Sequence, residues 1–261
     1  MTAEVRGALL LPGRLDGIDV SQVQGLIDWQ RVAAAGFRFT IVKASEGVAY
    51  CDPRAIANLD GARAAGLVAM AYAFVRPSQE RPREQVQRLW DCAGDTMPAR
   101  VVLDLESAPD DWSPTQVADF GEAFADVWRE YSALECVVYT YPDFARRRLA
   151  PPDRLARCPL WIASYRSTLT PWAPTPADRP PVPSPWVGWS MWQYSGGGGY
   201  RVPGVPGDCD RNLFAGGEPE LEAFCGFVSP AAETEPQLPE GTAIVHTLDY
   251  PMGRDVLDDD E

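Results

Sequence analysis

Short apolar runs alternate with helical segments through the first 165 residues, and this alternation constrains the fold more than any other feature. Strand-like runs rich in β-branched and apolar residues occur at residues 17–21, 37–45, 67–75, 100–106, 136–141 and 160–165. Helices are predicted between them at residues 28–35, 53–65, 80–92, 114–131 and 142–149. Strands that alternate with helices form successive βα units around a parallel sheet.

The pattern changes after residue 165. Residues 170–185 contain seven prolines, so this segment cannot form a regular helix. Two further strands are predicted at residues 190–195 and 208–214, joined by a four-glycine run and a turn rich in Pro and Gly. Eight strands with about five helices favour an irregular (β/α)8-like barrel, whose last strands lack helices, over an open doubly wound sheet.

Composition divides the 261-residue chain into three parts. We expect an N-terminal extension at residues 1–15, a barrel at 16–228, and an acidic, Pro-containing tail at 229–261 with nine acidic residues and one Arg. The tail is interpreted as solubilising; the alternative is a docking segment in which residues 242–245 add a strand to a partner's sheet. The longest apolar run is far shorter than the about 20 residues of a membrane span, and no export signal is evident.

Charge and histidine content exclude several function classes. The net charge of −14 argues against a nucleic-acid partner, which needs a basic surface. The one histidine, His246, lies in the tail, which removes Ser-His-Asp and Cys-His catalysis and most zinc sites from the barrel. We expect no metal and no cofactor. The six cysteines form no C-x-x-C pair, and Cys136 lies in an apolar run, so free thiols are predicted in preference to disulfides.

Carboxylates at strand ends are the main candidates for catalysis, because the reactive groups of β/α barrels lie at the C-terminal ends of the strands. Asp104 and Glu106 are two residues apart on one strand and therefore share a face. Neighbouring carboxylates raise each other's pKa, and a protonated acid beside an ionised one is what glycosidic bond cleavage requires. A D-x-E motif on its own is usually a pair of solvated carboxylates. Here two further carboxylates, Asp19 and Asp210, lie at the ends of other predicted strands. The four form the predicted catalytic set.

Aromatic residues occur at the remaining strand ends. Each alone is more often a core residue, but sugar rings present apolar C–H faces and hydroxyls that suit aromatic planes and phenols. As a set around four carboxylates they predict a saccharide groove. These residues are Tyr72, Phe74, Tyr139, Tyr141, Trp161, Tyr165, Trp192 and Tyr194.

Five sequence blocks resemble the signatures of glycoside hydrolase family 25, in the family's order and spacing. The blocks are GIDVS at 17–21, IVKASEG at 41–47, VLDLE at 102–106, LWIASY at 160–165 and MWQYS at 191–195. The resemblance spans residues 16–214, and the family comprises N-acetylmuramidases, a lysozyme type common in phage endolysins and bacterial autolysins. From the motifs and the aromatic set, the predicted substrate-binding residues are Lys43, Tyr72, Phe74, Tyr139, Trp161, Tyr165, Trp192 and Gln193.

The resemblance implies hydrolysis of the β-1,4 bond between N-acetylmuramic acid and N-acetylglucosamine in peptidoglycan. Glu106 would donate the proton to the leaving oxygen, and Asp104 would orient the acetamido group or stabilise positive charge at the anomeric carbon. Asp19 and Asp210 would complete the acidic floor. Which group activates water stays open. The expected place of action is the bacterial cell wall, reached by cell lysis, a holin or a phage or injection particle.

Two departures from the family pattern stand out. The third strand has Tyr72-Ala73-Phe74 where the family usually has Tyr-His-Phe, so weaker substrate contacts are expected there. The Pro-rich segment at 170–185 is longer than the family needs, which alters the groove rim on that side.

Two other functions are compatible with a barrel of this kind. A substrate-assisted chitinase has the signature D-x-x-D-x-D-x-E, but Ala99 and Val102 occupy its first two acidic positions. A catalytically silent saccharide-binding or structural barrel, in a phage tail or contractile injection assembly, is disfavoured because all four carboxylates are present.

Overall fold

The structure is a computed structural model that describes residues 11–149, 155–166, 172–196 and 199–226. The predicted tail, with its candidate docking segment at 242–245, lies outside the described residues. The three-part division of the chain therefore stays a prediction. In the described part of the chain, every helix is too short or too polar to cross a membrane.

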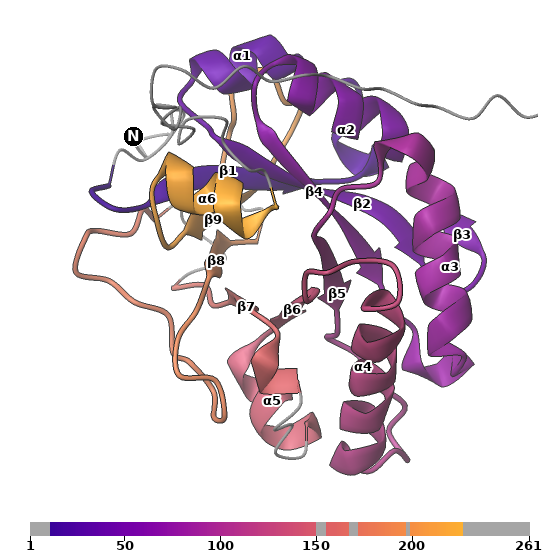
Figure 1. Cartoon of the computed structure of the whole chain (residues 1–261). Coiled ribbons are helices and arrows are strands. Elements are labelled where there is room, and N and C mark those ends of the chain that lie inside the picture. Colours follow the sequence, from indigo (N-terminus) through magenta and orange to yellow (C-terminus); the bar gives the residue numbers. More distant parts are fainter. Residues whose placement is uncertain (1–10, 150–154, 167–171, 197–198, 227–261) are drawn as a thin grey trace, which may run out of the picture. The chain divides into compact units, whose positions relative to one another are not determined.

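The described residues form nine strands, six α-helices and four short 3-10 helices (Figure 1). The strands are β1 (Leu15–Val20), β2 (Phe39–Glu46), β3 (Tyr50–Cys51), β4 (Val68–Phe74), β5 (Val101–Asp104), β6 (Val137–Thr140), β7 (Leu160–Ala163), β8 (Met191–Ser195) and β9 (Asp210–Phe214). The α-helices are α1 (Trp29–Ala34), α2 (Ala55–Ala64), α3 (Pro82–Ala93), α4 (Pro114–Trp128), α5 (Pro142–Arg148) and α6 (Glu218–Phe224). The 3-10 helices are η1 (Gln22–Gln24), η2 (Pro77–Gln79), η3 (Gly94–Thr96) and η4 (Leu155–Arg157).

Eight of the strands close into a barrel. Their order is β1-β9-β8-β7-β6-β5-β4-β2, and β1 pairs with β2 to complete the ring. Seven strands run parallel, whereas β9 is antiparallel to both β8 and β1. The two-residue β3 pairs with the end of β2 outside the ring. The predicted irregular barrel is confirmed, including the stretch from β7 to β9 without an α-helix among its described residues.

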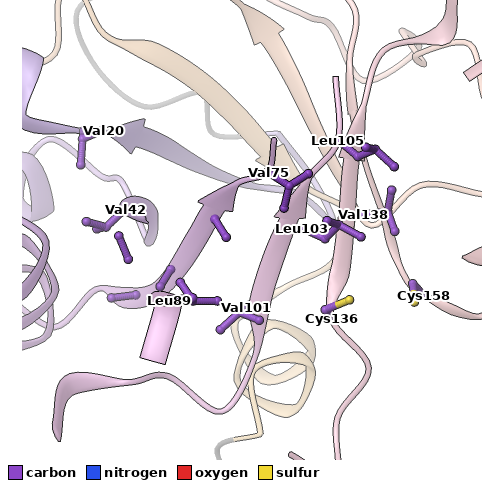
Figure 2. Close-up of a cluster of buried hydrophobic side chains, with 14 of the residues drawn as sticks. Val20, Val42, Val75, Leu89, Val101, Leu103, Leu105, Cys136, Val138 and Cys158 are labelled. Atoms are coloured by element: carbon purple, nitrogen blue, oxygen red, sulfur yellow. The ribbon is translucent and has the colours of Figure 1, made fainter. Parts of the chain in front are cut away.

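Side chains alternate between the barrel interior and an outer layer, as the period of two requires. The interior cluster contains large apolar residues from successive strands: Phe39, Ile41, Met70, Val102, Val137, Trp161, Met191 and Phe214. The outer cluster joins the opposite faces of the strands to helices α1 to α5 (Figure 2). It includes Val42, Leu103 and Val138 from strands and Leu89 from α3. The barrel therefore has an apolar interior layer and an apolar outer layer that packs the strands against the helices.

The helix α6, which the sequence analysis did not predict, closes the other end of the barrel. Its Leu221 belongs to the interior cluster, and Phe224 packs against Phe214 with ring centroids 5.3 Å apart. Because Leu15 pairs with Phe214 while Asp19 pairs with Asp210, α6 lies at the end opposite the strand-end carboxylates.

Cysteine pairing differs from the prediction. Cys51 on β3 and Cys92 on α3 form a disulfide with a Cα–Cα distance of 5.3 Å, so the expectation of free thiols is wrong for this pair. No local sequence pattern indicates this bridge, because the contact depends on β3 folding back along β2 towards α3. Cys136, Cys158, Cys209 and Cys225 are buried free thiols, as predicted.

The Pro-rich segment, defined as the described residues 172–186, has no regular secondary structure, as its prolines predict. It is nevertheless tied to the barrel. The guanidinium of Arg14 donates to the carbonyl oxygens of Thr175 and Asp178, at 3.4 and 2.8 Å. The indole of the buried Trp186 donates to the carbonyl of Cys158 at 3.0 Å.

Candidate active site

The four predicted carboxylates meet at one mouth of the barrel. Asp19 lies near the end of β1, Asp104 ends β5, and Glu106 follows two residues later. Because β9 is antiparallel, its first residue, Asp210, pairs directly with Asp19. Burial raises the pKa of the Tyr72 phenol well above its usual value, and the charges of Asp104, Asp19 and Asp210 raise it further. These carboxylates therefore all lie within electrostatic reach of one phenol.

Asp19 is held by two side-chain amides. Its Oδ1 accepts hydrogen bonds from Gln193 Nε2 and Asn212 Nδ2, each at 2.8 Å. Burial raises the pKa of Asp19 to about 6, although both hydrogen bonds favour the ionised form and lower it. Asp19 therefore keeps its proton to a higher pH than an ordinary aspartate does.

Gln193 connects Asp19 to two tyrosines. Its Oε1 accepts hydrogen bonds from the hydroxyls of Tyr139, at 2.8 Å, and Tyr165. The side chain is 3% exposed, so the predicted substrate-binding Gln193 sits behind the mouth and orients the groups around it. The indole of Trp161 donates to Asn212 Oδ1 at 2.9 Å and thereby fixes the second amide.

Asp104 is the most deeply placed of the carboxyls, with 6% of its surface exposed. Burial raises the pKa of Asp104 well above its usual value, and the charges of Glu106 and Asp19 raise it further. The charge of Lys43 lowers it. Its Oδ1 has no hydrogen-bond partner among the described residues. Burial and the neighbouring carboxylates therefore favour the protonated form of Asp104, and its buried Oδ1 lacks a partner among the described residues.

Glu106 faces open space. It lines a cavity of about 540 Å³, named here the active-site cavity. The other lining residues are Tyr139, Tyr141, Pro142, Asp143, Arg146, Ala163, Tyr165 and Pro181. Burial raises the pKa of Glu106, as does the charge of Asp19, while Arg76 and Lys43 lower it. Among the carboxyls, Glu106 thus combines a raised pKa with access to a ligand.

Two cations flank the carboxylates on the β2–β4 side. Lys43 Nζ lies 2.7 Å from Glu46 Oε2, and Arg76 Nε lies 2.9 Å from Glu46 Oε1. The Lys43 ammonium and the Arg76 guanidinium lie 5.1 and 4.5 Å from the ring centroid of Phe74, a cation–π arrangement. Although burial raises the pKa of Glu46, the hydrogen bonds and charges of both cations lower it overall. Glu46 is therefore an ionised clamp for the cations.

Comparison with known proteins fits this geometry. The family model for glycosyl hydrolases family 25 matches residues 18–205. This chain belongs to glycosyl hydrolase family 25.

Individual relatives agree with the family match. Lysozyme M1 of Streptomyces globisporus is 34% identical over 222 residues, covering 80% of this chain and 71% of that protein. The autolytic lysozyme of Clostridium acetobutylicum is 28% identical over 204 residues, covering 78% of this chain and 56% of its own length. The crystal structure of the bacterial lysozyme from Streptomyces coelicolor superposes with a TM-score of 0.71 at 31% identity, covering 82% of this chain and 98% of that one.

In this family 25 barrel the predicted aromatic residues divide into two groups. Tyr72, Phe74, Tyr139 and Tyr165 lie on the interior side at the mouth. Trp161 is 2% exposed and Trp192 is 3% exposed, so neither presents an open ring face.

Trp192 lies on the outer side of the family 25 barrel, away from the mouth. Its neighbours in β8, Met191 and Gln193, face the interior, so alternation turns Trp192 outward. Its indole donates to the carbonyl of Ser164 at 2.9 Å, and its ring packs 5.9 Å from that of Trp172. The structure does not bring Trp192 together with the carboxylates.

The same alternation corrects the expectation that Ala73, in place of the family's histidine, weakens substrate contacts. Tyr72 and Phe74 point to the interior, whereas Ala73 is buried in the outer cluster. A side chain at position 73 therefore faces the helices, and the replacement of histidine by Ala73 removes no group from this face of the mouth.

Three residues of the mouth were missing from the predicted set: Glu46, Arg76 and Asn212. The sequence contains a signal for two of them, because residues two apart along a strand face the same side. Arg76 is two residues after Phe74, and Asn212 is two residues after Asp210. Glu46 lies in a quoted motif but was assigned no role.

Proposed function

We propose that this family 25 chain cleaves the β-1,4 bond between N-acetylmuramic acid and N-acetylglucosamine. Family membership makes the chain a glycoside hydrolase, and its similarity to lysozymes supports peptidoglycan hydrolysis as the general activity. The finer proposal depends on one observation. Carboxyls with raised pKa converge at a single barrel mouth, and one of them, Glu106, lines an open cavity.

Glu106 is proposed as the general acid. A general acid must hold its proton at the working pH and reach the leaving oxygen. Burial and the charge of Asp19 supply the first condition by raising the pKa of Glu106. Its position in the active-site cavity supplies the second.

Asp104 and Asp19 are proposed to contact the sugar from the interior of the barrel mouth. Burial raises the pKa of Asp104 and so favours its protonated form, and its Oδ1 has no hydrogen-bond partner among the described residues, which suits a hydrogen bond to the acetamido group. Asp19 ionises at a pKa of about 6 and is fixed by two amides, which suits a carboxylate that balances positive charge at the anomeric carbon. Asp210, opposite Asp19, adds negative charge to the same floor.

The partly exposed tyrosines are proposed to contact the glycan. Tyr165 and Tyr141 are each 37% exposed and line the active-site cavity, where their rings suit the apolar faces of sugars.

The site of action follows at two levels. Similarity to an autolytic lysozyme supports action on the cell wall. We further propose that the protein reaches the wall after cell lysis, through a holin or within a particle, and that any protein partner binds the tail at residues 229–261.

Glu106→Gln tests the catalytic proposal. We expect this variant to lose at least about a hundredfold in rate on purified sacculi, because the amide has no proton to donate to the leaving oxygen. The assays are release of reducing ends and mass spectrometry of the products, which for the parent should end in N-acetylmuramic acid.

A matched control is Asp110→Asn, which neutralises an exposed carboxyl in the loop that follows Glu106. It should keep the parent rate, and both variants should keep the parent melting temperature. Parent-like turnover by Glu106→Gln would refute the acid role, and parent products ending in N-acetylglucosamine would refute the assigned bond.

A further inference from the structure

A second cavity adjoins the active-site cavity. It also measures about 540 Å³ and is named here the side cavity. It lies between α5 and the Pro-rich segment and shares Pro142, Arg146 and Pro181 with the active-site cavity. The two cavities are therefore neighbours, and Arg146 belongs to the lining of both.

The outer wall of the side cavity is fixed in place. Pro183 is buried, while Pro181 and Ser184 remain exposed on the cavity side. The hydrogen bonds of Arg14 and Trp186 hold the segment before and after this wall. The Pro-rich segment therefore forms a fixed wall of the side cavity, and the fixed φ angles of its prolines reduce the entropy that this wall would lose if a ligand bound there.

The lining of the side cavity has one charged group among apolar and small residues. Ala145, Leu149 and Val182 supply apolar surface, and Arg146 is the charged side chain. The Arg146 guanidinium is 62% exposed and pairs with Asp143 at a distance of 3.4 Å, longer than a strong charge-assisted hydrogen bond. The Arg146 side chain lines both cavities and is largely exposed, so a ligand in either cavity can reach it.

We propose that the side cavity binds the peptide stem of peptidoglycan, with Arg146 pairing to a carboxylate of that stem. The inference rests on the proposed function, because the stem is attached to the lactyl group of the N-acetylmuramic acid residue held beside Glu106. A short peptide of alanine and acidic residues matches the lining, with apolar surface for its methyl groups and a guanidinium for its carboxylates.

Two substrates separate stem recognition from sugar recognition. One is glycan strands that carry their stems, and the other is strands freed of stems by an amidase, which retain the lactyl carboxylate. We expect Arg146→Ala to lower kcat/KM on stem-bearing strands by about tenfold, mainly through KM, because a charge-assisted pair is lost. On stem-free strands its rate should stay within about twofold of the parent.

Three further variants sharpen the test. Arg147→Ala is the matched control, because Arg147 also pairs with Asp143 but lines neither cavity. It should match the parent on both substrates. Arg146→Lys should recover part of the affinity by restoring the charge. Ser184→Trp, which fills the side cavity from an exposed position, should raise KM for stem-bearing strands alone.

The possible failures are distinguishable. An equal loss by Arg146→Ala on both substrates would assign Arg146 to the sugar or the lactyl carboxylate, and no loss on either would leave the side cavity without a role; each result overturns the inference. If the parent cleaves neither substrate, the proposed function falls as well. If the parent cleaves stem-free strands normally, the proposed function survives whatever Arg146→Ala shows.

Discussion

Asp19 shows how the demands of a site oppose those of stability. Its pKa is raised from 3.8 to about 6, mainly by burial. Below pH 3.8 the carboxyl is protonated in both the folded and the unfolded chain, so it costs the fold nothing. As the pH rises from 3.8 to about 6, the unfolded chain ionises while the folded chain keeps its buried proton, so stability falls. Above about pH 6 both states are ionised, and the loss stays constant.

Asp19→Asn should therefore abolish activity and stabilise the protein at alkaline pH. Relative to the parent, we expect the free energy of unfolding of the variant to gain about 3 kcal/mol between pH 3 and pH 8. Urea unfolding of both proteins at the two pH values measures this difference. A parent that gains stability over the variant as the pH rises would contradict the assigned direction.

The alkaline limit of activity should depend on Arg76. Its charge lowers the pKa of Glu106, so Arg76→Gln should raise that pKa and move the alkaline limb of kcat/KM to higher pH. Arg81→Gln is the control, since Arg81 is exposed and pairs with Glu84. A limb that stays in place or moves to lower pH would show that Arg76 does not act on the acid.

At this scale, sequence predicts which residues gather but not what each one faces. Asp19, Asp104 and Asp210 were predictable because strand ends share one mouth. Trp192 was misplaced because aromatic character was considered without counting the alternation from Gln193. The unpartnered oxygen of Asp104 depends on depth inside the mouth, which no local pattern encodes.

The elements themselves were largely predictable, because their signals are local. All eight barrel strands occur where the apolar runs lie. The start of α4 is marked by a capping box between Ser113 and Gln116, with Pro114 at the first helical position. The strand β3 was not predicted, since two residues are too few to show a period. The helix α6 was missed because its stabilising contacts come from the barrel interior.

The disulfide between β3 and α3 should contribute measurably to stability. It joins residues 41 apart, so its loss would release a long loop in the unfolded chain. We expect Cys51→Ser with Cys92→Ser to lose about 2–4 kcal/mol in free energy of unfolding.

Chemical denaturation with and without a reductant tests this expectation. Reductant should destabilise the parent but leave the double variant unchanged. Equal stability of parent and double variant under oxidising conditions would show that the bridge does not constrain the unfolded chain.

At the scale of the whole molecule, the barrel is closed by contacts between its first and last strands. The amides that hold Asp19 come from residues 174 and 193 positions later in the chain. The buried ion pair of Arg211 with Asp16 spans 195 positions beside them. Such long sequence separations are entropically costly to close and fold late.

This closure has a consequence for the cell that makes the enzyme. While β8 and β9 are still being translated, Asp19 lacks both amides and Asp210 does not yet exist, so the nascent chain on the ribosome carries no complete site. Bond-cleaving capacity arises only at the end of synthesis.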